Sequence, residues 1–220
     1  MLTVVTLNWA RPGYLLRNLH QYGSYGIVDR VICFNNGPPL CRASDLPRKC
    51  VLIEASTNMG VYPRLAVASL AESEAILHTD DDIWVPEPTL KTLLDSWRQA
   101  PSSCHGLYGR VVRPVYEARD VFGPVEVVIT RAVVCSRRVN NAALSATPLF
   151  DDIVGVPRGN GEDIILSFAA IKLSRLMNFA YRLPAEDYPV PANTQIHRTW
   201  PGHLHHRQRV VARCRQVFSL

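Results

Sequence analysis

The chain has 220 residues, of which 47% are hydrophobic and 20% are charged, and its formal net charge is +5. A chain of this size and composition can bury a sizeable core, which excludes a disordered protein and fits one α/β domain. No apolar stretch reaches the roughly 18 residues that a membrane-spanning helix needs.

The start of the chain is an apolar, β-prone run at residues 2–7. It lacks the basic region of a signal peptide, so we expect a cytoplasmic protein. Six cysteines are scattered without a Cys-x-x-Cys pair, which argues against a disulfide framework or a zinc site. Cys33 and Cys135 lie inside apolar runs, and we expect both to be buried thiols.

The first half of the chain alternates between strand and helix patterns. Strands are predicted at residues 2–7, 28–34, 51–53 and 75–79, with helices at residues 14–22 and 64–71. This alternation is typical of a parallel, doubly wound sheet, which binds ligands at the carboxyl ends of its strands. Polar loops follow those strands, so we expect them to share one rim: residues 8–11, 35–37, 57–60 and 80–82.

Three adjacent carboxylates, Asp80, Asp81 and Asp82, follow the strand at residues 75–79. Like charges so close repel, so the cluster needs a cation or wide solvent exposure. Strand alternation would point Asp80 and Asp82 to one side and Asp81 away. Mg²⁺ and Mn²⁺ are usually held by one or two carboxylates plus substrate phosphates. The pair therefore predicts a divalent metal site, with a solvated turn as the alternative.

The second half has a mixed pattern of strands, loops and helices. Helices are predicted at residues 86–97 and 137–144, and strands at residues 106–112, 125–129 and 132–135. Residues 114–124 are expected to form a loop that faces an acceptor. A Gly-rich turn then leads into an apolar-faced helix at residues 164–173. Glu162 and Asp163 occupy its first turn, where the helix dipole also favours acidic side chains.

The end of the chain is basic. From His197 to Leu220 it contains five Arg, four His and no acidic residue. The pattern predicts a basic amphipathic helix from Gly202 onward, with three inward valines: Val210, Val211 and Val217. Such a tail suits anionic substrates or peripheral membrane contact. We expect no nucleic-acid partner, because only Trp200 and Phe218 offer stacking surfaces.

The order of these parts resembles a GT-A glycosyltransferase. Three runs are similar to those of the exostosin-like family, glycosyltransferase family 64: Thr6-Leu7-Asn8-Trp9-Ala10-Arg11, Thr79-Asp80-Asp81-Asp82 and Glu162-Asp163-Ile164. The resemblance spans roughly residues 2–182. It implies one α/β domain of GT-A type over residues 1–220. A Rossmann-like nucleotide-binding half, about residues 1–100, is fused to a mixed-sheet acceptor half, about residues 101–220.

The resemblance also implies an activity and a set of binding residues. A hexosyl or N-acetylhexosaminyl group would move from a nucleotide sugar, with UDP as first choice, to a hydroxyl of a glycan or another acceptor. Mn²⁺ or Mg²⁺ would be held by Asp82 and Asp80. Residues implied around the base, ribose, phosphates and sugar are Asn8, Arg11, Asn36, Asn58, Arg64, Asp80 and Asp81.

Asp163 is implied as the catalytic residue, with Glu162 beside it. The family implies a retaining reaction, in which Asp163 lies beside the anomeric carbon. The family usually has Asp-Asp where this chain has Glu-Asp, a pair also found in inverting family 2 enzymes, where the Asp is the general base. Two further alternatives stay open: a nucleotidyltransferase, although the Gly-rich loop it usually has after the first strand is missing here, and a basic nucleic-acid-binding module.

Overall fold

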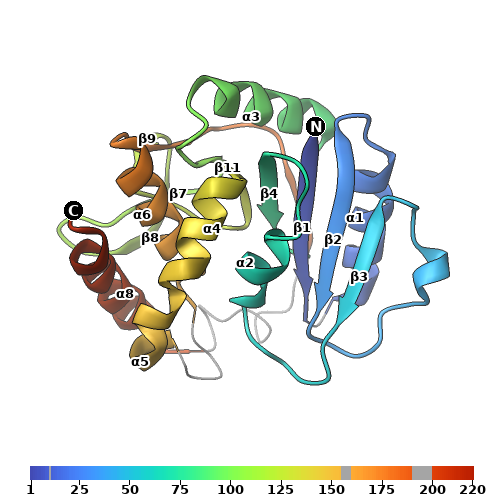
Figure 1. Ribbon diagram of the computed structural model, residues 1–220, viewed down its shortest axis with the longest axis horizontal. Coiled ribbons are helices and arrows are strands. Elements are labelled where there is room, and N and C mark those ends of the chain that lie inside the picture. Colours follow the sequence, from blue (N-terminus) through green and yellow to red (C-terminus); the bar gives the residue numbers. More distant parts are fainter. Residues whose placement is uncertain (10, 155–159, 190–199) are drawn as a thin grey trace.

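The computed structural model describes residues 1–9, 11–154, 160–189 and 200–220. Its centre is an eight-stranded sheet with the spatial order β3-β2-β1-β4-β11-β6-β12-β9 (Figure 1). The strands are β1 (Leu2–Asn8), β2 (Val28–Asn35), β3 (Cys50–Glu54), β4 (Ala75–Thr79), β6 (His105–Gly106), β9 (Gly123–Val125), β11 (Ala132–Ser136) and β12 (Asn178–Ala180).

The first four strands are parallel, in the order β3-β2-β1-β4. This confirms the doubly wound first half, and β4 has the predicted bounds. β11 then runs antiparallel to β4, and β6 antiparallel to β11. The second half therefore extends the same sheet with mixed strand directions.

Two small sheets flank the large one, with the orders β10-β7-β8 and β13-β5. Their strands are β5 (Ile83–Trp84), β7 (Gly109–Val111), β8 (Glu117–Val121), β10 (Val127–Val128) and β13 (Glu186–Asp187). The loop predicted at residues 114–124 is wrong, because β8 lies within it. β8 is an edge strand whose residues are half-exposed or exposed, so no apolar alternation marks it in the sequence.

Helices cover both faces of the large sheet (Figure 1). The longer ones are α1 (Pro12–Ser24), α2 (Pro63–Ala68), α3 (Glu87–Gln99), α4 (Arg137–Ala146), α6 (Glu162–Ser174) and α8 (His203–Phe218). The short ones are η1 (Ala43–Asp45), η2 (Thr147–Phe150) and α5 (Asp151–Val154). β1 separates two cores: Leu2 and Val4 pack with α1 and α3, whereas Val5 and Leu7 pack with α2, α4 and α6.

Helix α6 is the central helix of the second half, packed against both α4 and α8. Its residues from Glu162 to Ala170 are all buried, as expected for a helix covered on every side. The predicted inward stripe of α8 is confirmed, since Val210 and Val211 are buried and Val217 packs against the core. None of the helices in the described ranges has the length and apolar character to cross a bilayer.

The carboxyl ends of β1, β2 and β4 meet at one rim, the lower edge of Figure 1. Asn8 at the end of β1 pairs with Asn35 at the end of β2, and Thr6 pairs with Thr79 at the end of β4. The loops after these strands are therefore neighbours, as predicted.

Candidate active site

The three aspartates lie at this rim, just after β4. The strand ends one residue before Asp80, and the chain turns at Asp81 and Asp82. Asp80 Oδ1 lies 2.7 Å from Nη2 of Arg64. Asp81 and Asp82 instead contact Nη1 of Arg11, at 3.0 and 2.5 Å. The prediction that Asp81 points away from Asp82 is therefore wrong, because strand alternation has already ended.

The surroundings give neighbouring carboxylates different ionisation behaviour. Burial raises the pKa of Asp81 to about 7, with the adjacent carboxylates adding to the rise and Arg11 opposing it. Burial also acts on Asp80, but the positive charge of Arg64 and of other arginines outweighs it and lowers the pKa of Asp80. At neutral pH, Asp80 is therefore ionised, whereas Asp81 retains a large share of its proton.

Arg64, on α2, joins the aspartates to the second acidic motif. Its side chain is only 4% exposed, and its Nη1 donates to the carbonyl oxygen of Thr130 at 3.1 Å. Its Nη2 contacts Asp80, and its Nε lies 3.7 Å from Oε1 of Glu162. Two motifs far apart in the sequence therefore share one buried arginine.

Glu162 accepts hydrogen bonds on both carboxylate oxygens. The Thr130 hydroxyl donates to Oε1 at 2.9 Å, and the Gly161 amide donates to Oε2 at 3.1 Å. Burial raises the pKa of Glu162, the neighbouring Asp163 adds to the rise, and Arg64 opposes it. These contacts fix the position of the Glu162 carboxylate next to Arg64.

Asp163 is paired with Arg207 of α8. Arg207 Nη2 lies 2.6 Å from Asp163 Oδ2, and both side chains are almost fully buried. The Ile164 amide donates to the other oxygen of Asp163 at 2.8 Å. The Arg207 guanidinium also stacks over the Tyr116 ring and donates to Oδ1 of Asn160 at 3.3 Å.

Gly161 allows α6 and α8 to approach at this point. Its φ is 126°, in the region that favours glycine, and a Cβ there would lie 3.1 Å from Val210. His206 of α8 adds a contact from Nε2 to the carbonyl oxygen of Asn160 at 2.7 Å. The start of α6 is therefore docked on α8, which sets the position of Asp163.

Arg207 belongs to the basic tail, whose pattern predicts contact with an anionic substrate. The structure places it against Asp163 instead. One signal in the sequence indicates this buried position. Arg207 lies three and four positions before Val210 and Val211, so it falls on the buried stripe of the helix.

Arg131 is a site residue that the sequence motifs do not indicate. It lies between β10 and β11, with its Nε 3.5 Å from Oδ1 of Asp82 and its Nη2 2.9 Å from Oδ1 of Asp187. Its guanidinium lies over the Tyr108 ring, whose hydroxyl also donates to Asp187. Arg131 thus ties the aspartate cluster to β13, a contact between distant segments that no local pattern predicts.

The predicted asparagines gather at the same rim. Asn8 is buried and donates to Oδ1 of Asn35 at 2.7 Å. Asn36 is held between the Met59 amide and the Gly60 carbonyl, so its side chain stabilises the loop. Asn58 is exposed and accepts from the Gly60 amide at 2.8 Å.

The cluster has a donor set that suits a hard divalent cation. Within the described ranges, no three His, Cys, Asp or Glu side chains are arranged as a complete metal site. Mg²⁺ and Mn²⁺ need only one or two carboxylates when substrate phosphates complete the shell. Oδ2 of Asp81 is buried without a hydrogen-bond partner among the described residues, so its lone pairs are free to coordinate a cation. The cluster therefore offers oxygen ligands of the kind that the predicted metal needs, although Asp80 and Asp82 themselves are paired with Arg64 and Arg11.

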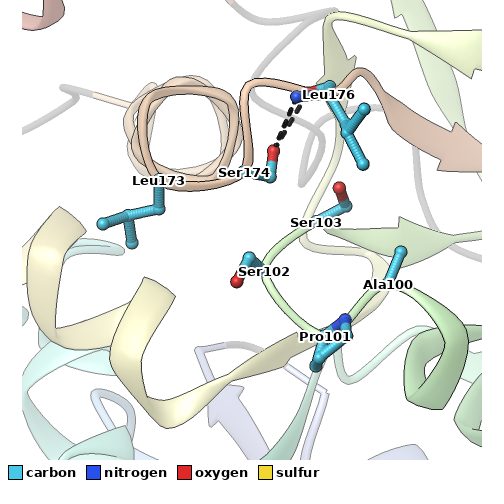
Figure 2. A pocket seen from close by; sticks show the side chains of 7 residues that line it. All are labelled: Ala100, Pro101, Ser102, Ser103, Leu173, Ser174 and Leu176. Atoms are coloured by element: carbon cyan, nitrogen blue, oxygen red, sulfur yellow. Dashed lines mark hydrogen bonds between the residues drawn. The ribbon is translucent and has the colours of Figure 1, made fainter.

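A separate cavity of about 240 Å³ lies at the C-terminal end of α6 (Figure 2). It is lined by the segment after α3 and by the end of α6: Ala100, Pro101, Ser102, Ser103, Leu173, Ser174 and Leu176. The acidic residues lie at the opposite end of α6, roughly 20 Å along a 13-residue helix. This cavity is not part of the candidate active site.

The fold has a parallel half with an Asp-x-Asp at its rim, and Arg64 joins that motif to a second acidic pair. This arrangement is the one expected of nucleotide-sugar glycosyltransferases with a GT-A fold. The chain belongs to a family within that class. It matches the glycosyl transferase family 64 domain over residues 2–220. No curated protein matches it.

Solved structures support the fold. The crystal structure of S. aureus TarS is similar with a TM-score of 0.57 and 14% identity, covering 88% of this chain and 37% of TarS. S. aureus TarS 1-349 in complex with UDP-GlcNAc is similar with a TM-score of 0.60 and 15% identity, covering 96% and 65%. This chain therefore spans less than two thirds of either TarS chain.

Proposed function

We propose that this chain transfers a sugar from a nucleotide sugar, with UDP as the first nucleotide to test, to an acceptor hydroxyl of a glycan. The single observation behind this proposal is the Arg64 bridge. Arg64 contacts both Asp80 and Glu162, which brings the donor-side aspartates within reach of the late acidic pair. One bound donor would then meet both motifs.

In this proposal the rim binds the nucleotide diphosphate. Asp82 and Asp80 would hold Mn²⁺ or Mg²⁺, which supplies Lewis-acid stabilisation of the leaving diphosphate. The guanidinium of Arg11 presents donors that suit phosphate oxygens. The asparagine-rich loops, with Asn58 exposed among them, would contact the base and ribose.

Asp163 would act at the sugar. Both of its oxygens already accept a hydrogen bond, from Arg207 and from the Ile164 amide. These two contacts fix the orientation of the carboxylate, which in this proposal would lie beside the anomeric carbon. We propose retention over inversion because the family resemblance implies it, with Arg207 as the residue that positions Asp163 and Glu162 beside it.

The sugar would be a hexose or an N-acetylhexosamine. The similar TarS structure contains UDP-GlcNAc, which makes this compound the first donor to assay. It would be compared with other UDP-hexoses at the same concentration of Mn²⁺.

Metal dependence tests the proposal. UDP release from a panel of nucleotide sugars would be followed with Mn²⁺, with EDTA, and with EDTA followed by excess Mn²⁺. The expected result is activity that EDTA abolishes, that Mn²⁺ restores and that Asp82→Ala lacks. Asp95→Ala serves as the control, because Asp95 is 68% exposed on α3 and pairs only with Arg98 among the described residues. Activity unaffected by EDTA and by Asp82→Ala would refute the proposal.

A further inference from the structure

Arg11 occupies the space between two carboxylates of the aspartate cluster. Its Nη1 lies 3.0 Å from Oδ1 of Asp81 and 2.5 Å from Oδ2 of Asp82. All three side chains are no more than 15% exposed. One positively charged nitrogen therefore touches two separate carboxylates, which is also the arrangement of a small cation between two ligands.

The contact is one of charge more than of hydrogen-bond geometry. Neither Nε nor Nη1 of Arg11 has a hydrogen-bond partner of normal geometry in the described part of the chain. Arginine–carboxylate pairs are frequently bidentate, with two parallel N–H groups. Arg11 instead places a single nitrogen where two oxygens converge.

The other two arginines of the cluster are anchored elsewhere. Arg64 also donates to Thr130, and Arg131 also pairs with Asp187 and stacks on Tyr108. Among the described residues, Arg11 forms side-chain ion pairs with Asp81 and Asp82 and with no others. Arg11 is therefore the arginine that can leave the cluster without breaking a second attachment among these residues.

The position of Arg11 in the chain suits a second partner. It directly precedes α1, in the loop after β1 at the rim where the other strands end. An anion bound at this rim would lie within the reach of a long, flexible guanidinium side chain. A nucleotide diphosphate is such an anion, and it would give Arg11 a new partner once it leaves the aspartates.

We propose that Arg11 is a tethered counter-cation that exchanges places with the metal ion and moves to the donor diphosphate. This inference rests on the proposed function. Without nucleotide, the metal must displace Arg11 from Asp82, the carboxylate that both of them contact, so it binds weakly. With nucleotide, the diphosphate accepts Arg11, so metal and nucleotide strengthen each other's binding by the same factor. The enzyme would thereby avoid holding a metal ion in the absence of its donor.

Mn²⁺ binding to the full chain tests this inference without any turnover. The dissociation constant for Mn²⁺ would be measured by the electron paramagnetic resonance signal of the free ion, alone and with saturating UDP. For the wild type we expect UDP to tighten Mn²⁺ binding on the order of tenfold or more. For Arg11→Ala we expect Mn²⁺ alone to bind on the order of tenfold more tightly than to the wild type, and the effect of UDP to be smaller than in the wild type by the same factor.

Two variants control for loss of charge and loss of structure. Arg11→Lys keeps the positive charge and should bind Mn²⁺ alone as weakly as the wild type. Arg17→Ala removes a half-exposed arginine of the neighbouring helix α1 and should match the wild type in both measurements. Thermal melting checks folding, and Mn²⁺ alone should raise the melting temperature of Arg11→Ala more than that of the wild type.

The inference is overturned if Arg11→Ala binds Mn²⁺ alone no more tightly than the wild type, or keeps the full effect of UDP. That failure is distinct from failure of the proposed function. If Asp82→Ala still abolishes Mn²⁺ binding in the presence of UDP, the metal site stands and only the role of Arg11 is wrong. If the wild type binds no Mn²⁺ even with UDP, both are wrong.

Discussion

Replacing Arg207 by Met tests the buried ion pair that positions Asp163. The two side chains are 6% and 5% exposed, and Nη2 lies 2.6 Å from Oδ2. Methionine fills much of the same space but leaves Asp163 as an uncompensated buried charge. Removal of one partner of such a pair costs about 3–5 kcal/mol of unfolding free energy. In a domain of this size, the loss lowers the melting temperature by roughly 6–20 °C.

The assay is urea unfolding of the wild type, Arg207→Met, Asp163→Asn and the double variant. Because the double variant buries no unpaired charge, we expect it to lose less stability than the sum of the two single variants. Arg209→Met is the matched control, since Arg209 is exposed on the same helix and its loss should change stability by about 0.5 kcal/mol or less. If Arg207→Met costs no more than this control, or if the two single losses simply add, the ion pair does not stabilise the site.

Two further variants, the second with a matched control, test other parts of the site. The pKa of Asp81 is raised to about 7, so the folded state binds its proton more tightly than the unfolded chain, and wild-type stability should fall as pH rises from about 4 to about 7. Asp81→Asn should remove the part of this decline that Asp81 causes, up to about 4 kcal/mol at pH 8 in urea unfolding, and equal pH slopes for the two proteins would contradict the assignment. Gly161→Ala should lose about 1–3 kcal/mol, because its φ is 126° and a Cβ would press on Val210 at 3.1 Å. Gly13→Ala, with no neighbour within 4 Å, should instead gain up to about 1 kcal/mol, and equal melting temperatures for the two variants would refute this reasoning.

The first half of the fold is predictable from local patterns. Buried parallel strands are continuous apolar runs, and polar loops end them sharply, so the predicted bounds of β4 agree with the structure to the residue. The rim follows from the rule that parallel strands end on the same side. The same rule correctly predicts that the loops of Asn8, Asn36 and the aspartates lie together.

The second half is less predictable because its strands are short and lie at edges. β8 exposes most of its side chains and has no apolar face to reveal it. Alternation fails at Asp81 because it holds only while the strand continues. The pairs Arg207–Asp163 and Arg131–Asp187 join segments far apart in the chain, and their partners are set by the packing of α8 on α6 and by β13 on β5.

The most direct test of the central claim compares donor binding with turnover in the same preparations. The wild type, Asp82→Ala and Asp163→Asn would be titrated with the nucleotide sugar that most raises the melting temperature in the presence of Mn²⁺, and UDP release would be measured in parallel. If the aspartate cluster binds the leaving diphosphate and Asp163 acts at the sugar, Asp82→Ala loses both binding and release. Asp163→Asn then binds the donor within a few-fold of the wild type and loses release. Normal donor binding by Asp82→Ala, or normal release by Asp163→Asn, would contradict the account.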